Sequence, residues 1–275
     1  MADYLQMWKD LGMDVETHDQ LCEVLPQAFG DVFLSQENRP ESMDYYNFVV
    51  SEIHGVRPME LIEHQKKGGK VFGTFCVYVP DEIVFAASGI ATGLCGGSQF
   101  WVPGGEKVLP SNICPLIKAS VGARLDRTCP FFRIADMYVG ETTCDGKKKA
   151  WEILAEDVPV HVMDLPQMKR RKDVVAWAEE IKDFKAVVEK MTGNEVTAES
   201  LNDAIKMIND KRRALERLYN FRKEEKLPIS GADCLVISQI AFYDDPIRFT
   251  QMTNKLCDEL EQRVKDGVSV FKKGA

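Results

Sequence analysis

The stretch that decides the fold is residues 70–83, which read KVFGTFCVYVPDEI. Its first half, 70–76, is rich in β-branched and aromatic residues, and this composition predicts a β-strand. Pro80 suits the first position of a helix, and the acids Asp81 and Glu82 suit its first turn. We therefore expect a helix from Pro80 to about Ser88, which makes this stretch the first half of a βαβ unit.

The same alternation continues along the chain. The residue pattern predicts further strands at 90–94, 134–139 and 158–163, and helices at 115–121 and 147–156. Strands that alternate with helices predict a mostly parallel sheet. In such a sheet the loops that follow the strands gather at one edge, where ligands bind.

Helical segments flank this α/β region on both sides. Apolar residues recur at helical spacing through 3–66, and Gly68-Gly69 is typical of a helix C-cap. Beyond Pro166 we expect long charged helices at 167–192, 198–226 and 244–266, the second of them capped by Thr197. The expected fold is α/β, with an N-terminal helical segment (1–67), a Rossmann-like parallel-sheet domain (68–165) and a C-terminal helical region (166–275).

Composition and charge narrow the class of protein. The formal net charge of −8 argues against nucleic acid as a partner and gives no support for docking on anionic lipid. The N-terminus lacks the pattern of a signal peptide, and no apolar run approaches the ~20 residues that span a bilayer. We therefore expect a cytoplasmic protein without a membrane segment. In that compartment the eight cysteines are expected to be ligands or catalysts rather than disulfides.

Four cysteines lie at the ends of predicted elements. Cys76 ends the first strand, Cys114 precedes Pro115 at a helix start, Cys129 lies near the start of the 134–139 strand, and Cys144 lies just before the 147–156 helix. Helix N-termini stabilise thiolates, as do nearby cations such as Lys147, Lys148 and Lys149. Four thiolates at a loop edge suit an iron–sulfur cluster.

Other interpretations of the cysteines stay open at this point. From their positions alone, these four cysteines are as consistent with burial in the core as with metal binding, because cysteine is among the most buried residue types. Zinc is the next metal to consider, but structural zinc sites prefer closely spaced pairs, which this sequence lacks. Cys22, Cys234 and Cys257 lie in apolar helical contexts and are expected in the core, whereas Cys95 is undecided between loop and core.

Further polar and glycine motifs carry weaker signals. The pairs Gly96-Gly97 and Gly104-Gly105 lack a phosphate-binding fingerprint and are expected in turns. His161 is expected to be a satisfied core residue, and the basic run 169–172 a solvated helix face. Glu141, Asp145 and Asp136 are candidates for acid–base chemistry, although Asp145 equally suits a helix cap.

Four segments together carry a resemblance to a known family. They are GTFCVYVPDEI (73–83), LCGGSQF (94–100), EKVLPSNICPLIKAS (106–120) and ADMYVGETTCDGKKK (135–149). The sequence resembles the 2-hydroxyacyl-CoA dehydratase and benzoyl-CoA reductase superfamily, and within it the double-cubane cluster proteins. The resemblance runs from about residue 15 to the end of the sequence.

The resemblance implies a redox function. Members have two Rossmann-like domains, are usually dimeric, and hold [4Fe–4S] or double-cubane clusters through cysteines. An ATP-hydrolysing activator with its own cluster gives them low-potential electrons, and they act on acyl-CoA thioesters or reduce small molecules. Cys76 and Cys114 match superfamily ligands, and Cys129 and Cys144 look like the additional ligands of the double-cubane branch.

One departure from the family pattern changes the expectation. Family members continue into a second α/β domain with further cysteine ligands, and this sequence stops near where that domain is expected to begin. We expect that domain to be missing, and the exposed interface to promote self-association. The expected function is an ATP-coupled iron–sulfur reductase component. The alternatives are a dehydratase or benzoyl-CoA reductase type subunit, and a non-catalytic scaffold that binds a partner.

Overall fold

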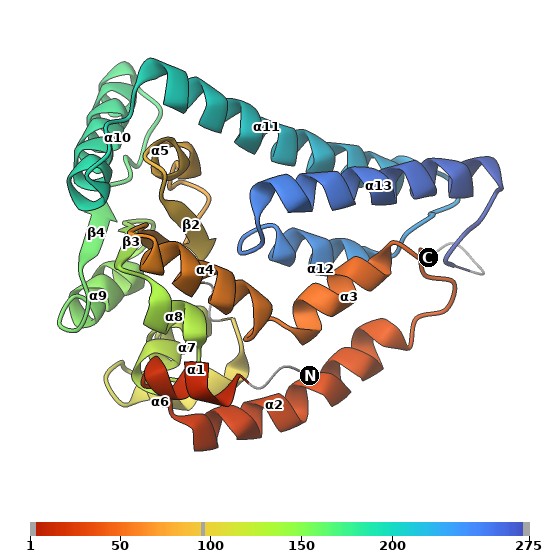
Figure 1. The fold of residues 1–275 in the computed structure, drawn as a ribbon, viewed down its shortest axis with the longest axis horizontal. Coiled ribbons are helices and arrows are strands. Elements are labelled where there is room, and N and C mark those ends of the chain that lie inside the picture. Colours follow the sequence, from red (N-terminus) through yellow and green to blue (C-terminus); the bar gives the residue numbers. More distant parts are fainter. Residues whose placement is uncertain (1–3, 95–96, 272–275) are drawn as a thin grey trace. The chain divides into compact units, whose positions relative to one another are not determined.

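The computed structural model describes residues 4–94 and 97–271 (Figure 1). The chain forms two compact units, which are described separately below. The first comprises residues up to 21 together with 58–204, and the second comprises 22–57 together with the residues from 205 onward. Cys95, whose role was undecided from the sequence, and Gly96 lie outside the described residues.

The first unit contains a four-stranded parallel sheet with the order β2-β1-β3-β4 (Figure 1). Its strands are β1 (Val71–Thr74), β2 (Ile90–Gly93), β3 (Met137–Glu141) and β4 (Val160–Met163). The expectation of an α/β fold with a parallel sheet is therefore confirmed. β1 is buried along its whole length because it lies in the middle of the sheet, whereas β4 forms an edge and is only partly buried.

Helices pack on both faces of this sheet. On one face, Phe72 and Val139 share a hydrophobic core with Phe184, and the helices there are α5 (Asp81–Ala86) and α10 (Arg171–Thr192). The other face packs against α8 (Pro130–Ile134) and α9 (Asp145–Leu154), and α7 (Pro115–Leu125) packs on these two helices. Gly140 allows this close approach, because a Cβ at its position would lie 2.4 Å from the ring of Trp151 in α9.

Two local predictions in this unit were wrong. The strand expected at 134–139 begins only at Met137, because residues 130–134 form α8 with Pro130 at its first position. Gly104 and Gly105 are not in a turn but in α6 (Val102–Glu106), which follows the 3-10 turn η2 (Gln99–Trp101). Glycine is needed at 105 because a Cβ there would lie 2.0 Å from the carbonyl oxygen of Lys118 in α7.

The predicted N-terminal helices are confirmed. They are α1 (Leu5–Asp10), α2 (Val15–Phe29), the π-helical turn η1 (Gly30–Leu34), α3 (Met43–Ser51) and α4 (Val56–Lys66). Gly68 follows α4 with a φ of +89°, a left-handed conformation that suits a glycine at a helix C-terminus. α2, α4 and α11 each contribute residues to both units.

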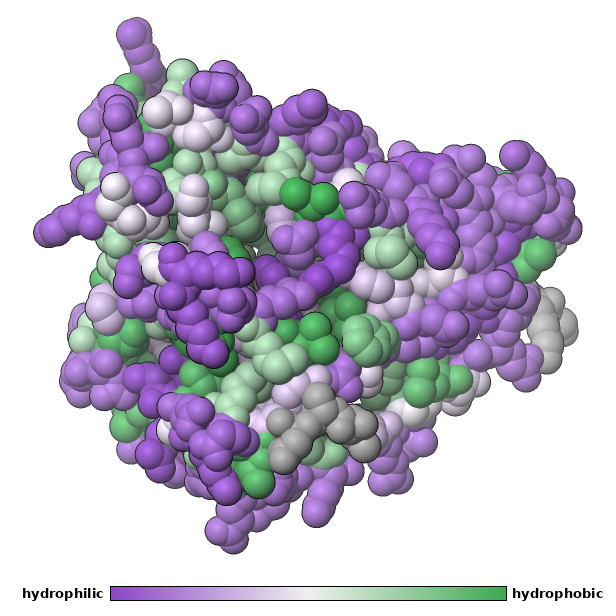
Figure 2. Space-filling model, viewed as in Figure 1, coloured by the Kyte–Doolittle hydropathy of each residue, from purple (hydrophilic) through white to green (hydrophobic). Residues whose placement is uncertain are grey.

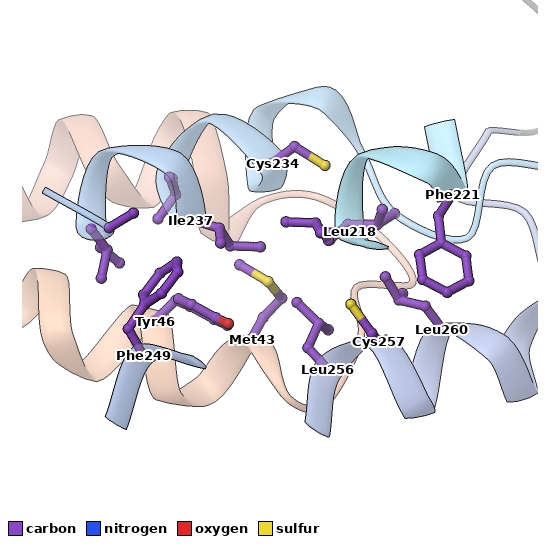
Figure 3. Close-up of a cluster of buried hydrophobic side chains, with 14 residues drawn as sticks. Met43, Tyr46, Leu218, Phe221, Cys234, Ile237, Phe249, Leu256, Cys257 and Leu260 are labelled. Carbon is purple, nitrogen blue, oxygen red and sulfur yellow. The ribbon is translucent and has the colours of Figure 1, made fainter. Parts of the chain in front are cut away.

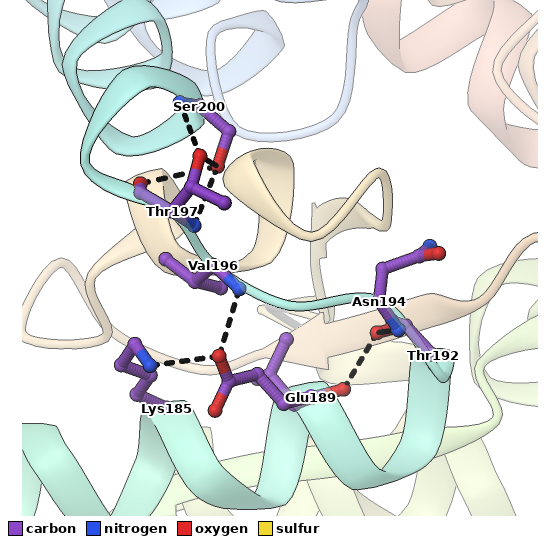
Figure 4. A network of polar contacts seen from close by, with 8 residues as sticks. Lys185, Glu189, Thr192, Asn194, Val196, Thr197 and Ser200 are labelled. Carbon is purple, nitrogen blue, oxygen red and sulfur yellow. Dashed lines mark hydrogen bonds and ion pairs between the residues drawn. The ribbon is translucent and has the colours of Figure 1, made fainter.

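The connection between α10 and α11 (Ala198–Asn220) is held by polar contacts (Figure 4). Glu189 accepts hydrogen bonds of 2.7 Å from the ammonium of Lys185 and from the backbone N–H of Val196. Thr197 caps α11 as predicted, because its hydroxyl oxygen accepts a hydrogen bond of 3.1 Å from the backbone N–H of Ser200.

The second unit is helical and has its own core (Figure 3). Its elements include α3, η3 (Phe221–Lys223), α12 (Gly231–Ile240) and α13 (Pro246–Lys265). Three fully buried side chains of this core come from three different helices: Tyr46 from α3, Ile237 from α12 and Leu256 from α13. The hydroxyls of Tyr46 and Thr253 lie 2.9 Å apart, so the one polar group of this tyrosine is satisfied inside the core.

The face of the molecule seen in Figure 2 is mainly hydrophilic, with hydrophobic residues between the polar ones. Charged residues make up 28% of the sequence, which agrees with this view. Among the described residues, no helix has both the length and the apolar character that crossing a membrane requires.

Candidate functional site

The sheet has a topological switch point between β1 and β3. From β1 the chain passes through α5 to β2 on one side, and later returns to β3 on the other side of β1. In open α/β sheets ligands bind in the crevice outside the carboxyl ends of the strands at such a point. The loops that leave β1 and β3 here carry Cys76 and Cys144, as the sequence predicted.

Two helices begin at the same edge with a cysteine as the N-cap residue. Cys114 precedes α7 and Cys144 precedes α9, and neither side chain makes a capping hydrogen bond. Both side chains are exposed, and Cys76 is partly buried. The first backbone N–H groups of a helix have no partner within the helix and carry partial positive charge. Both thiols therefore lie beside N–H groups that favour a bound anionic group.

The three cysteine-bearing segments converge on one small cavity. Its volume is about 30 Å³, and it is lined by Phe75, Leu116, Ile117, Ser120, Lys147, Ala150 and Trp151. These residues come from the position just after β1, the first half of α7 and the first two turns of α9. Gly146 brings the two helix starts together, because a Cβ at its position would lie 2.7 Å from Cδ1 of Ile117. Cys76, Cys114 and Cys144 thus belong to neighbouring segments.

Cys129 has a different environment from these three. It was expected near the start of a strand, but it is the N-cap residue of α8, since 130–134 are helical. Its thiol is buried, and burial raises its pKa to about 11 despite opposing hydrogen bonds from the backbone N–H groups of Phe132 and Phe131. The neutral thiol is therefore the favoured form of Cys129 in this conformation.

Glu141 is the last residue of β3 and precedes Cys144 by three positions in the sequence. Its side chain is fully buried and forms an ion pair with Lys147 in the first turn of α9. Oε1 also accepts a hydrogen bond of 3.1 Å from the hydroxyl of Thr143, whereas Oε2 is buried without a partner among the described residues. The sequence marked Glu141 as an acid–base candidate but gave no sign of this pairing, which joins a strand end to a helix start.

The other two acidic candidates, Asp136 and Asp145, hold the backbone or begin a helix. Asp136 accepts hydrogen bonds from the backbone N–H of Val71 (2.8 Å) and from the side chain of Gln65 (2.9 Å), at the amino end of the sheet and away from the cysteines. Asp145 is the first residue of α9, so its expected role as the cap is taken by Cys144.

The remaining predicted residues divide into core, edge and surface. Cys234 and Cys257 are buried in the core of the second unit, as predicted, and Cys22 is partly buried in α2. His161 was expected to be a satisfied core residue, but it lies on edge strand β4, stacks on Phe184 and leaves Nε2 without a partner among the described residues. The basic run 169–172 is exposed at the start of α10, as predicted.

Comparison with known proteins decides the family. The family model of the 2-hydroxyglutaryl-CoA dehydratase D-component matches residues 76–275. This chain belongs to that family. The matched region begins at Cys76 and includes Cys114, Cys129 and Cys144. The resemblance seen in the sequence is thereby confirmed at the level of the superfamily.

Curated relatives of this family support the same assignment. The chain is 37% identical over 210 residues to the putative dehydratase subunit YjiM of Escherichia coli K12, covering 75% of this chain and 54% of that protein. It is 26% identical to one of the benzoyl-CoA reductase subunits of Thauera aromatica, covering 61% of this chain and 44% of that protein. It is 22% identical to the (R)-2-hydroxyglutaryl-CoA dehydratase beta subunit of Acidaminococcus fermentans, covering 73% and 53%. The chain therefore spans about half the length of the curated relatives it matches.

Proposed function

We propose that this member of the dehydratase D-component family is an iron–sulfur reductase component that receives low-potential electrons from a separate ATP-hydrolysing activator. The proposed ligands are Cys76, Cys114, Cys129 and Cys144, and the proposed cluster-binding domain is residues 68–165. The cluster is a [4Fe–4S] or double-cubane centre, and the chain acts as a homodimer. The observation that carries the proposal is the presence of two exposed thiols and one partly buried thiol around one sheet edge at a topological switch point.

The donor set fits an iron–sulfur cluster better than it fits a hard metal ion. Cysteine thiolates hold iron–sulfur clusters, whereas carboxylate and carbonyl oxygens suit Mg²⁺ and Ca²⁺. The bound cluster supplies one-electron transfer at low potential. The chain supplies the thiolates and, at the starts of α7 and α9, backbone N–H groups that stabilise their negative charge.

The four proposed ligands are not equally ready to bind iron. Cys114 and Cys144 are exposed, and Cys76 is partly buried. Cys129 must give up a buried, protonated state to serve as a ligand, because burial raises its pKa to about 11. We therefore expect Cys129→Ser to lose less iron than Cys114→Ser does.

The test of this proposal is spectroscopic. The protein is purified without oxygen, its visible absorption is recorded, and electron paramagnetic resonance (EPR) spectra are taken after reduction. We expect broad charge-transfer absorption that bleaches on reduction and a paramagnetic signal in the reduced protein. A colourless protein that stays without iron after reconstitution with iron and sulfide would overturn the proposal and favour the non-catalytic, partner-binding scaffold.

A second function in the same class is favoured by the relatives. Two of them are named as dehydratase subunits and one as a benzoyl-CoA reductase subunit. The alternative is therefore a subunit that acts on acyl-CoA thioesters. Isothermal titration calorimetry tests this alternative. The protein is titrated with a 2-hydroxyacyl-CoA and with benzoyl-CoA, and free coenzyme A is the control. Saturable binding that requires the acyl group would favour this alternative over a small-molecule reductase.

A further inference from the structure

The ion pair between Glu141 and Lys147 encloses the turn that carries Cys144. Glu141 is the last residue of β3, Lys147 is in the first turn of α9, and residues 142–144 form the connection. The Glu141 side chain is fully buried and that of Lys147 is 19% exposed. The pair therefore lies in the interior, unlike an ordinary surface salt bridge.

Two more hydrogen bonds fix the same turn. The hydroxyl of Thr143 donates to Oε1 of Glu141 at 3.1 Å, which ties the middle of the turn to the strand end. The indole N–H of Trp151 donates to the backbone carbonyl of Glu141 at 2.9 Å, which ties the strand end to the second turn of α9. The turn before Cys144 is thus held at its two ends and in its middle.

Burial makes the ion pair an effective constraint. An exposed pair is weakened by water and by salt, whereas a buried charge that loses its partner is strongly destabilised. Oε2 has no partner among the described residues, so the contacts of the carboxylate with Lys147 and Thr143 both go through Oε1. Removing the Lys147 ammonium therefore leaves a buried carboxylate with only one hydrogen bond from a side chain.

We propose that the Glu141–Lys147 ion pair is a positioning device that holds Cys144 at the carboxyl edge of the sheet before any cofactor binds. The role of Cys144 as a ligand rests on the function proposed above, but the ordering of the turn does not. Preorganised ligands bind a metal centre without a further cost in ordering the chain. Glu141 and Lys147 are positioning residues, because they act through Cys144.

A matched control exists on the same helix. Lys149 and Glu152 form an ion pair of 2.6 Å in α9, with side chains that are 60% and 66% exposed. Lys147→Met and Lys149→Met remove the same charge from neighbouring positions of one helix. Only the first removes a partner of Glu141, so a difference between them reports on the buried pair.

The test measures the turn and the cluster separately. Amide hydrogen exchange of peptides covering 142–150 is measured on iron-free protein, because the backbone N–H groups of Thr142 and Lys148 donate to the carbonyls of Met163 and Cys144. Iron content and EPR line shape are measured after reconstitution. In Lys147→Met we expect exchange in this turn to accelerate at least tenfold, iron to fall by at least half and the line shape to change. Lys147→Arg should restore all three, and Lys149→Met should match wild type. Peptides from β1 should exchange as in wild type throughout.

Two outcomes separate this inference from the proposed function. If wild type binds no iron, the proposed function fails, and the exchange of 142–150 still decides whether the pair orders the turn. If Lys147→Met exchanges like wild type in this turn, the inference is wrong, whatever the iron content. Should Lys147→Met fail to fold, Glu141→Gln/Lys147→Met removes both charges and is expected to restore the fold while the turn stays unprotected. Protection of the turn in that double variant would equally overturn the inference.

Discussion

The hydroxyl of Thr142 donates a hydrogen bond of 2.7 Å to a carboxylate oxygen of Asp164 and accepts one of 2.8 Å from the backbone N–H of Leu165. Thr142 follows β3 and Asp164 follows β4, so this side chain joins two loops at the carboxyl edge of the sheet. The backbone N–H of Asp164 also donates to Glu180 of α10 at 3.1 Å. The loop that carries Cys144 is therefore linked to its neighbours as well as to its own strand and helix.

Thr142→Val should weaken the fold through this link. Valine keeps the shape of the buried side chain but removes both hydrogen bonds, which we expect to cost about 1–3 kcal/mol of the free energy of unfolding. Thr250→Val is the control, because among the described residues its hydroxyl bonds only to the carbonyl of Pro246 within its own helix. A change of ~0.3 kcal/mol in the free energy of unfolding is expected for it. Urea denaturation measures both. Equal losses in the two variants would contradict the linking role of Thr142.

The accessible and buried thiols should differ in their rates of alkylation. We expect iodoacetamide to modify Cys114 and Cys144 of the native iron-free protein first, because both are exposed. Cys129 and Cys257 should react at least ten times more slowly, since burial hides both and raises their pKa values, to about 11 and about 12. Mass spectrometry of tryptic peptides over a time course measures each rate. Early modification of Cys129 would contradict its buried position.

Gly105→Ala should disrupt the packing of α6 on α7. The added Cβ would lie 2.0 Å from the carbonyl oxygen of Lys118, which is backbone and cannot rotate away. Overpacking of this kind costs about 1–3 kcal/mol, or more where the backbone must move. Gly30→Ala is the matched control, because a Cβ there meets no atom of the described residues within 4 Å, and it should be neutral or slightly stabilising. Thermal unfolding of both variants tests this, and an unchanged midpoint in Gly105→Ala would refute the close packing.

His161 should make stability fall as the pH decreases below neutrality. Burial lowers the pKa of His161, an effect that Glu180 and Asp183 only partly oppose. Below the ordinary value of 6.5 the unfolded chain therefore binds more protons than the folded one, and stability decreases until the folded pKa is passed. His161→Phe should keep the stacking on Phe184 and reduce this slope between pH 7.5 and 5.5. Because burial also lowers the pKa of His18, part of the slope should remain.

Chemical denaturation of wild type and His161→Phe at a series of pH values measures the two slopes. At pH 8 both proteins carry a neutral group at this position, so their relative stability there gives the reference. The same pH dependence in both proteins would show that His161 does not contribute.

The parallel sheet and the helix starts could be predicted from the sequence because local patterns determine them. The 70–76 strand, Pro80 and Pro115 each indicate their element through composition or a restricted backbone. The short helix α8 was missed because Phe131 and Phe132 are aromatic residues typical of strands, and because a five-residue helix has too few turns to show a period.

The site could be predicted only in part. Placement at element ends predicted that Cys76, Cys114 and Cys144 lie at one edge, since the carboxyl ends of parallel strands share an edge. The burial of Cys129 depends on packing around α8, which no local pattern reports. The Glu141–Lys147 pair was missed for a similar reason, because it joins residues across a strand-to-helix connection where neither the period of a strand nor that of a helix applies.

The measurement that tests the central claim most directly is the content of iron and acid-labile sulfide per chain in protein purified without oxygen. Wild type, Cys114→Ser and Cys144→Ser are compared with Cys257→Ser, whose thiol is buried in the second unit. We predict iron with matching sulfide in wild type and in Cys257→Ser, and a loss of at least half in the other two variants. No iron in wild type after reconstitution, or equal iron in all four proteins, would contradict a cluster held at the carboxyl edge of the sheet.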